Sequence, residues 1–323
     1  MLFSEEELNV ATDVVRRWVP PTPQYVWPLL AGEFNAQVWV KHENHTPTGA
    51  FKVRGGLVYA DRLCATRPTV TGIVSATRGN HGQSLAFAGR AHGLSVTIVV
   101  PEGNSPDKNA AMRAFGAELI VHGHDFQAAR EDASEIGFER GLETVPSYHP
   151  DLVLGVATYA RELFDAAGEL DGVYVPVGMG SGICGLIGVR DLLGLETEIV
   201  GVVAERAPAT LLSVQAGRPI STDSADTFVD GVATRVPDPD AIAVMLSGAA
   251  RIISVSEEAT AKAMRVLFTA THNVAEPAGA LALAGLIAER DAVIGRRVAV
   301  IQTGGNVDTD RLVEVFSGRV PGP

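Results

Sequence analysis

A chain of 323 residues is long enough for a sizeable core and for two lobes or domains. Its hydrophobic content of 46% with only 6% aromatic residues is typical of an α/β enzyme rather than of a disordered chain. The net charge of −12 and the lack of a basic run argue against nucleic acid or an anionic membrane as a partner, whereas a small anionic substrate is compatible with them.

The N-terminal residues do not have the pattern of a signal peptide, because residues 1–8 have neither a basic flank nor a long apolar core. No apolar run in the sequence reaches the length of a membrane span. The two cysteines, Cys64 and Cys184, are far apart and indicate a reducing compartment rather than a disulfide framework. We therefore expect a cytoplasmic protein.

In chain order, Ser4 and Glu7 form a capping-box pattern at the start of a short helix, and residues 37–43 alternate like a strand. Strand-like and helix-like segments then follow one another. The expected strands are residues 70–75, 95–100, 118–121, 172–177, 198–203, 251–255 and 298–302. The expected helices are residues 51–66, 80–92, 105–115, about 125–140 with Asp125 as its cap, 151–167, a helix after 183, 257–271, 278–290 and 308–316.

This alternation predicts parallel sheets that are covered by helices on both faces. We expect an α/β chain with two lobes, each an open and mostly parallel sheet. The predicted larger domain consists of residues 1–45 and 146–323, and the predicted smaller domain, residues 46–145, is inserted into it.

Lysine is rare in this chain, which has only Lys41, Lys52, Lys108 and Lys262, and arginine supplies most of the other positive charge. Lys52 follows Phe51 in a turn framed by glycines. An arginine-rich chain that keeps a lysine beside an aromatic ring can need an amine that loses its proton and forms an imine, which arginine cannot do. Lys52 is therefore a candidate nucleophile. The alternative is a solvated lysine at the start of a helix.

Glycines dominate residues 178–182 (Gly-Met-Gly-Ser-Gly), between an expected buried strand and a helix. Backbone N–H groups and the positive end of a helix dipole meet in such a loop and form a cradle suited to a phosphate. The loop lacks the Gly-Lys-Ser/Thr ending of a nucleotide P-loop and the complete glycine fingerprint of a dinucleotide site. The alternative is a tight turn that only needs glycines.

Three further stretches carry polar groups at element ends. In the strand-to-helix loop of residues 75–83, N–H groups can hold a carboxylate, and Asn80 can donate to a phenolate oxygen or merely cap its helix. Thr303 follows the strand at 298–302, where ligands gather in open α/β sheets; an ordinary turn is the alternative. Glu276 precedes a proline-initiated helix and fits an N-terminal capping position.

Together, and in this order, these stretches resemble the fold-type II pyridoxal-phosphate (PLP) enzymes of the threonine/serine dehydratase and serine racemase branch. Residues 47–55 (Pro-Thr-Gly-Ala-Phe-Lys-Val-Arg-Gly) look like the family's P-T-G-S-F-K-x-R-G motif, and 79–81 look like its G-N-H loop. Residues 178–182 resemble its phosphate loop, and 303–306 its S-G-G-N. Four ordered motifs across nearly the whole chain are far more specific than any one alone.

The resemblance implies a two-lobed fold like that of tryptophan synthase β, with PLP as cofactor. It implies that Lys52 binds PLP as an imine and later acts as the base at the substrate Cα, with Phe51 packed near the ring. Asn80 would bind the phenolate oxygen, and Thr303 would face the pyridine nitrogen. The residues implied in phosphate binding are Gly178, Met179, Gly180, Ser181 and Gly182. Those implied near the substrate are Thr77, Arg78, Gly79 and His81.

The implied reaction is dehydration and deamination of a β-hydroxy amino acid, such as L-threonine or L-serine, to a 2-oxo acid and ammonia. A neutral hydroxyl from Thr303 at the pyridine nitrogen makes a milder electron sink than a carboxylate, which favours prompt loss of a β-leaving group over transamination. The resemblance also implies a homodimer or homotetramer with a small amino-acid substrate.

Arg78 departs from the family, which has serine in its racemases and a small residue in its dehydratases at this position. Racemisation needs a second acid/base on the opposite face of the ring, and arginine stays charged, so a serine or amino-acid racemase is the runner-up. Arg78 can instead pair with a substrate carboxylate, as in 3-hydroxyaspartate, or face solvent. Phenylserine is a further candidate substrate, and a non-catalytic binding protein is the alternative from another class.

Two other features bear on partners. Val203 stands where the family's divalent-metal site usually has a carboxylate, so we expect no metal there, although Glu205 is a possible substitute. The chain ends at Pro323, and we therefore expect no regulatory domain of the kind found on biosynthetic threonine dehydratases.

Overall fold

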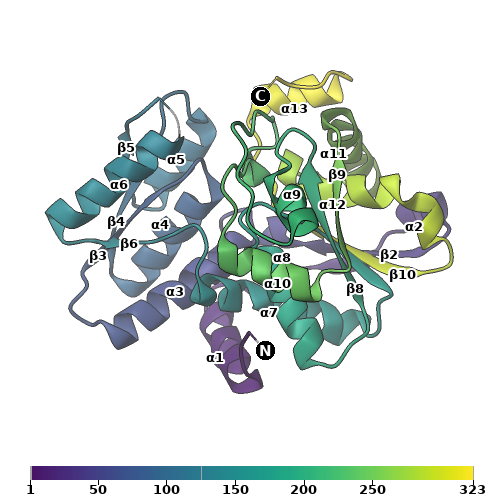
Figure 1. Cartoon of the computed structure of the whole chain (residues 1–323), viewed down its shortest axis with the longest axis horizontal. Helices are drawn as coiled ribbons and strands as arrows, with labels where there is room; N and C mark the ends of the chain where they lie inside the picture. Colours follow the sequence, from purple (N-terminus) through teal and green to yellow (C-terminus); the bar gives the residue numbers. More distant parts are fainter. Residues whose placement is uncertain (1, 125, 323) are drawn as a thin grey trace.

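A computed structural model describes residues 2–124 and 126–322; Asp125, which we predicted as a helix cap, lies outside the described residues. Two open sheets are present (Figure 1). The six-stranded sheet has the order β1 (Gln24–Val26), β2 (Gln37–His42), β10 (Arg297–Gln302), β7 (Gly172–Pro176), β8 (Glu198–Ala204) and β9 (Arg251–Val255). The four-stranded sheet has the order β5 (Glu118–Val121), β4 (Ser95–Val100), β3 (Gly72–Ala76) and β6 (Glu143–Thr144).

Among the described strands, the pair β1 and β2 is antiparallel and the other pairs are parallel. The predicted α/β class with two mostly parallel sheets is thereby confirmed. The four-stranded sheet is built from residues 72–144 and lies to the left in Figure 1, apart from the six-stranded sheet. The domain boundaries at residues 45/46 and 145/146 stay a prediction.

The α-helices are α1 (Glu5–Arg16), α2 (Pro28–Phe34), α3 (Lys52–Thr66), α4 (Asn80–His92), α5 (Pro106–Ala114), α6 (Phe126–Arg140), α7 (Pro150–Ala167), α8 (Ser181–Leu192), α9 (Ala209–Ala216), α10 (Pro239–Gly248), α11 (Glu257–Thr271), α12 (Pro277–Ala288) and α13 (Thr309–Phe316). Helix α1 has the predicted capping box between Ser4 and Glu7. Sequence analysis missed β1, β6, α2, α9 and α10, and placed the start of α8 too late. None of the described helices combines the length and apolar character needed to cross a membrane.

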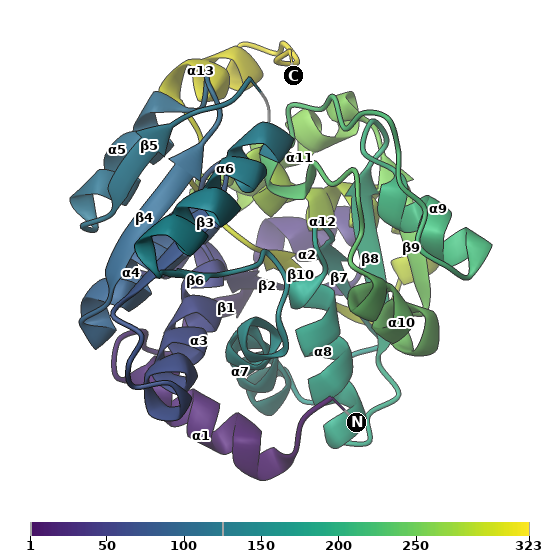
Figure 2. The same ribbon diagram turned by 60° about the vertical axis from the view of Figure 1, so that its left-hand side comes forward.

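Helices cover both faces of the six-stranded sheet, as its continuous apolar strands require. Along β7, Val173 and Val175 point into a core shared with α3, α7 and α8, while Tyr174 lies between them and packs in a second core with α11 and α12. The first core also contains α1, and Figure 2 shows α1, α3 and α7 lying side by side, in agreement with their mutual contacts.

Strand order brings three predicted site segments to one edge. Strands β2, β10 and β7 are neighbours and run parallel, so their carboxyl ends lie together. The Lys52 turn follows β2, Thr303 follows β10, and the loop of residues 178–182 follows β7. This edge is where ligands bind in open α/β sheets.

A buried ionic network holds helix α3, which begins at Lys52. Arg54 is 0% exposed; its Nε donates to Glu43 Oε2 at 2.8 Å and its Nη2 to Glu162 Oε2 at 2.9 Å. Lys41 on β2 donates to the same Glu162 oxygen at 2.7 Å, and the Thr22 hydroxyl donates to Glu43. Two cations and two carboxylates thus join β2, α3 and α7 away from water.

We expect Arg54→Met to lower the free energy of unfolding by roughly 3–5 kcal/mol, because it leaves two buried carboxylates with Lys41 alone. The control is Arg62→Met on the same helix, whose side chain is 36% exposed and pairs with Asp151 and Glu7. An exposed pair of this kind contributes at most about 1 kcal/mol. Urea unfolding of both variants measures the difference, and equal midpoints would contradict the assigned role of the network.

Candidate functional site

The Lys52 turn is bound to the loop after β10 by backbone contacts. Phe51 N donates to Thr303 O at 3.0 Å, and Gly305 N donates to Gly49 O at 2.9 Å. Gly49 has a φ of +69°, and a Cβ there would collide with the side chain of Asn306. The glycine is therefore needed both for its backbone conformation and for the close approach of the two loops.

Lys52 itself is half-buried at the start of α3, with Nζ 4.4 Å from the centroid of the Phe51 ring. Burial lowers the pKa of Lys52 to about 8, and the nearby Glu276 carboxylate opposes this shift. A lysine with this pKa has an accessible neutral amine near neutral pH, as imine formation and proton abstraction both require. These properties differ from those of a solvated lysine.

Asn80 is the first residue of α4, and the helix cap is Gly79, so the capping interpretation of Asn80 is wrong. The Asn80 side chain instead donates from Nδ2 to Glu276 Oε1 at 2.6 Å. Its Oδ1 accepts from Asn306 Nδ2 at 2.8 Å, and that same nitrogen also donates to Thr48 O at 2.7 Å. Partners on both sides fix the orientation of the Asn80 amide and leave one N–H for a ligand.

Glu276 occupies the N-cap position of α12, but its side chain does not cap the helix. It is 3% exposed; burial raises its pKa, and Lys108 and Asn80 counteract this effect. Sequence analysis missed its place in the site. The available signal was an isolated acid directly before a helix that is apolar on all sides, since such an acid must be buried with α12 and find polar partners there.

The loop of residues 178–182 connects β7 to α8, and α8 begins at Ser181 with Gly180 as its N-cap at a φ of +104°. A Cβ at Gly178 would lie 2.8 Å from Gly231 O, and one at Gly180 would lie 2.9 Å from Ala241 Cβ. A side chain is thus excluded at Gly178 and at Gly180, and the first N–H groups of α8 stay open to a ligand, as an anion cradle requires.

Tyr159 connects this loop to the Lys52 turn. Its hydroxyl donates to Gly182 O at 3.1 Å, and its ring meets the Phe51 ring edge-on at a centroid distance of 6.2 Å. Met179 in the same loop is half-buried and accepts a weak hydrogen bond from the Thr234 hydroxyl at 3.9 Å. The predicted cofactor-binding segments therefore meet at one place.

The loop after β3 and the first turn of α4 contain the residues predicted near the substrate. The Thr77 hydroxyl accepts from Gly79 N at 3.1 Å and so shapes the loop. His81 is buried, and its Nε2 has no hydrogen-bond partner among the described residues. Burial, with a smaller contribution from Lys52, lowers the pKa of His81 to about 3, so this ring is neutral. The Arg78 side chain is 48% exposed, with Nη1 3.9 Å from Asp230 Oδ1.

These features fit PLP, which carries an aldehyde, a phosphate and a ring oxygen. The site has an amine of lowered pKa at Lys52, a glycine cradle at residues 178–182, an oriented donor at Asn80, and an unpaired buried nitrogen on His81. Within residues 2–124 and 126–322, the structure has no group of three or more His, Cys, Asp or Glu residues that could hold a metal.

Comparisons with known proteins bear on the family and the cofactor of this chain. The L-threo-3-hydroxyaspartate ammonia-lyase of Saccharomyces cerevisiae is 29% identical over 97% of this chain and 96% of its own. The biosynthetic L-threonine dehydratase of Salmonella typhimurium is 32% identical over 89% of this chain and 56% of its own, so the chain spans about half the length of that relative. The crystal structure of a threonine deaminase from T.th. matches with a TM-score of 0.88 at 31% identity, over 95% of this chain and 99% of its own.

The family model described as pyridoxal-phosphate dependent enzyme matches residues 15–304, a range that contains the predicted cofactor-binding and substrate-binding residues from Phe51 to Thr303. With PLP as the cofactor of that family, the chain belongs to the pyridoxal-phosphate dependent enzymes.

Proposed function

We propose that this enzyme dehydrates and deaminates a β-hydroxy amino acid, with L-threonine and L-serine as first candidates, to a 2-oxo acid and ammonia. The observation that carries the proposal is a half-buried Lys52 with a pKa of about 8, at the junction of the loops that hold Asn80, Thr303 and residues 178–182. Proteins called threonine dehydratase and threonine deaminase are among its relatives, which supports the same chemistry.

PLP, when bound, withdraws electrons from the substrate Cα and so makes its proton acidic. In the proposed roles, the neutral Nζ of Lys52 would take the Cα proton, and Asn80 would donate its remaining N–H to the ring oxygen. The first N–H groups of α8 would hold the phosphate, and the uncharged Thr303 hydroxyl would face the pyridine nitrogen. The Cβ–O bond would break and the hydroxyl would leave with a proton as water, which balances the proton taken from Cα. A second water would then hydrolyse the released aminoacrylate to the 2-oxo acid and ammonia.

The position of Arg78 favours a second candidate substrate, 3-hydroxyaspartate. Its guanidinium is half-exposed on the loop that carries Thr77 and Gly79, directly before His81 in α4, where a β-carboxylate could approach it. A relative named L-threo-3-hydroxyaspartate ammonia-lyase matches over nearly its whole length and supports this alternative. A racemase is less well supported, because Arg78 stays charged and the neutral His81 ring, with a pKa of about 3, has no proton to give as an imidazolium.

We propose a cytoplasmic homodimer or homotetramer, without nucleic-acid or membrane partners, in which residues 46–145 form a small domain inserted into the cofactor-binding domain. Size-exclusion chromatography with light scattering tests the oligomeric state.

We expect Lys52→Ala to lower 2-oxo acid formation at least about a hundredfold, because it removes the proposed base. Purified wild type should release a 2-oxo acid from at least one of L-threonine, L-serine, 3-hydroxyaspartate and phenylserine, and Lys262→Ala, on the surface, should behave like wild type. Borohydride reduction of the holoenzyme and peptide mapping should place the label on Lys52. Wild type that turns over none of the four substrates, or a label elsewhere, would disprove the assignment.

We expect Glu276→Gln to move the pH dependence of PLP attachment to lower pH. The ionised carboxylate favours the charged form of Lys52 and so raises its pKa; without it, burial alone acts, and the pKa falls below its present value of about 8. The neutral amine then becomes available at lower pH. The rate of attachment to PLP-free protein, followed by absorbance against pH, measures the shift. Glu258→Gln, an exposed residue, is the control, and a midpoint that stays or rises would contradict the expectation.

We expect Arg78→Ala to raise KM for 3-hydroxyaspartate about tenfold while leaving KM for L-threonine nearly unchanged, since a charge-assisted contact to the β-carboxylate would be lost. Arg90→Ala, at the exposed far end of α4, is the matched control. Equal changes for both substrates would show that Arg78 does not read a substrate carboxylate.

A further inference from the structure

Lys108 lies on helix α5, which connects β4 and β5 of the four-stranded sheet. This lysine has no role in the function proposed above. It lies in the first turn of α5, and its side chain is only 11% exposed. Its aliphatic stem crosses over Gly79 so closely that a Cβ there would lie 2.6 Å from Lys108 Cδ. The loop that begins α4 therefore has a glycine at the point where the lysine passes over it.

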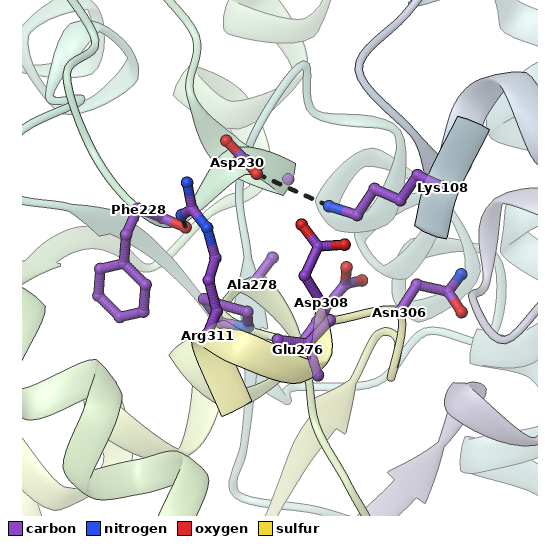
Figure 3. Close-up of a pocket in the computed structure, with 11 residues that line it drawn as sticks. Lys108, Phe228, Asp230, Glu276, Ala278, Asn306, Asp308 and Arg311 are labelled. Carbon is purple, nitrogen blue, oxygen red and sulfur yellow. Dashed lines mark hydrogen bonds and ion pairs between the residues drawn. The ribbon is translucent and has the colours of Figure 1, made fainter. Parts of the chain in front are cut away.

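The Lys108 ammonium reaches a small pocket whose lining includes acidic side chains from segments around the six-stranded sheet. Asp230, Glu276 and Asp308 all contribute to this pocket, and Figure 3 shows the lysine pointing toward them from the opposite side. Lys108 Nζ lies 3.7 Å from Asp230 Oδ2. Three carboxylates around one pocket repel one another, so the two cations that line the same pocket, Lys108 and Arg311, lower the energy of the arrangement.

A second contact crosses between the same elements. The Ser105 hydroxyl, at the N-cap of α5, donates to Asp308 Oδ1 at 2.5 Å and accepts from Lys108 N at 3.1 Å. The first turn of α5 is thus held at two points, by its cap and by its lysine. Both partners, Asp230 and Asp308, belong to segments that surround the six-stranded sheet.

Lys108 also acts on the acid that orients Asn80. Burial raises the pKa of Glu276, and Lys108 is the largest of the influences that counteract this shift. The ionised carboxylate is the stronger acceptor for the Asn80 Nδ2 group, which lies 2.6 Å from Glu276 Oε1. Loss of the ammonium would therefore weaken the anchor of the Asn80 amide as well as the contact between α5 and Asp230.

We propose that Lys108 is a positioning residue: its ammonium joins α5 to Asp230 and holds Glu276, and through Glu276 the Asn80 amide, in the arrangement that receives PLP. This proposal rests on the role of Asn80 in the proposed function. It assigns Lys108 no contact with the reacting atoms.

The test is a titration of PLP-free protein with PLP, followed by absorbance, for wild type and three variants. Lys108→Met keeps the length of the stem but removes the charge, and we expect a Kd about tenfold higher. Lys108→Arg should recover at least half of that change on a logarithmic scale, and Lys262→Met, an exposed lysine elsewhere, should bind like wild type. A Lys108→Met Kd equal to that of wild type would overturn the proposal.

A double-mutant cycle with Asp230→Asn separates positioning from general loosening. If Lys108 and Asp230 act as a pair, the double variant should have about the same Kd for PLP as Lys108→Met alone. Its Kd should not rise by the product of the two single changes. Multiplicative effects would contradict the pair. Thermal unfolding of the PLP-free variants should leave all midpoints close to wild type, and a loss of folding in Lys108→Met alone would make its role structural and overturn the assignment.

The two proposals can fail separately. If the variants change PLP binding as expected but wild type turns over none of the tested amino acids, the assignment of Lys108 holds and the proposed reaction fails. If wild type forms a 2-oxo acid while Lys108→Met binds PLP normally, the reaction holds and the role of Lys108 is refuted.

Discussion

The arrangement of the site depends on one chain of side-chain hydrogen bonds, in which Thr48 O accepts from Asn306, Asn306 donates to Asn80, and Asn80 donates to Glu276. These residues are far apart in sequence. Thr48, Asn80 and Asn306 come after strands β2, β3 and β10 of the two sheets, and Glu276 lies between α11 and α12. An amide with a partner on each side has one orientation, and removal of any member leaves a largely buried polar group unpaired. The chain of bonds therefore fixes the loops relative to one another and leaves a single donor of Asn80 for a ligand.

The same enclosure that requires these bonds also sets the protonation of the site. Burial disfavours the charged forms of both Lys52 and Glu276, lowering the pKa of the amine and raising that of the acid, while their mutual attraction favours the charged forms of both. Lys52 can thus give up its proton near neutral pH although the Glu276 carboxylate lies nearby. A site of this kind needs an acid that is close but is partly neutralised by other cations, and Lys108 lies where it can do this.

Much of the fold was predictable from the sequence, because long segments such as Asn80–His92 and Ser95–Val100 combine clear periodicity with end signals. The missed elements, including α9 and α10, are short and lie in a stretch without a clear alternation of strand and helix. The site was predictable where a local motif carries the chemistry, as at Lys52. The capping interpretation of Asn80 was wrong, whereas Glu276 does occupy the predicted N-cap position of α12 but uses its side chain to accept from Asn80. The contact between the two was not predictable because they lie about two hundred residues apart, and no local pattern records a tertiary contact.

The first turn of helix α3 lies between two regions, one in which the buried polar groups are paired and one in which some are not. In its first turn, the buried Arg54 donates hydrogen bonds to Glu43, Glu162 and Thr158. Charges and hydrogen bonds balance there, which indicates a structural role for this region. At its N-terminus, Lys52 has a lowered pKa and His81 a buried nitrogen without a partner among the described residues. Unpaired buried groups cost free energy and persist where a ligand will pair them. The paired network around Arg54 therefore holds the start of α3 in place, so that the unpaired groups at Lys52 and His81 can stay available to a ligand.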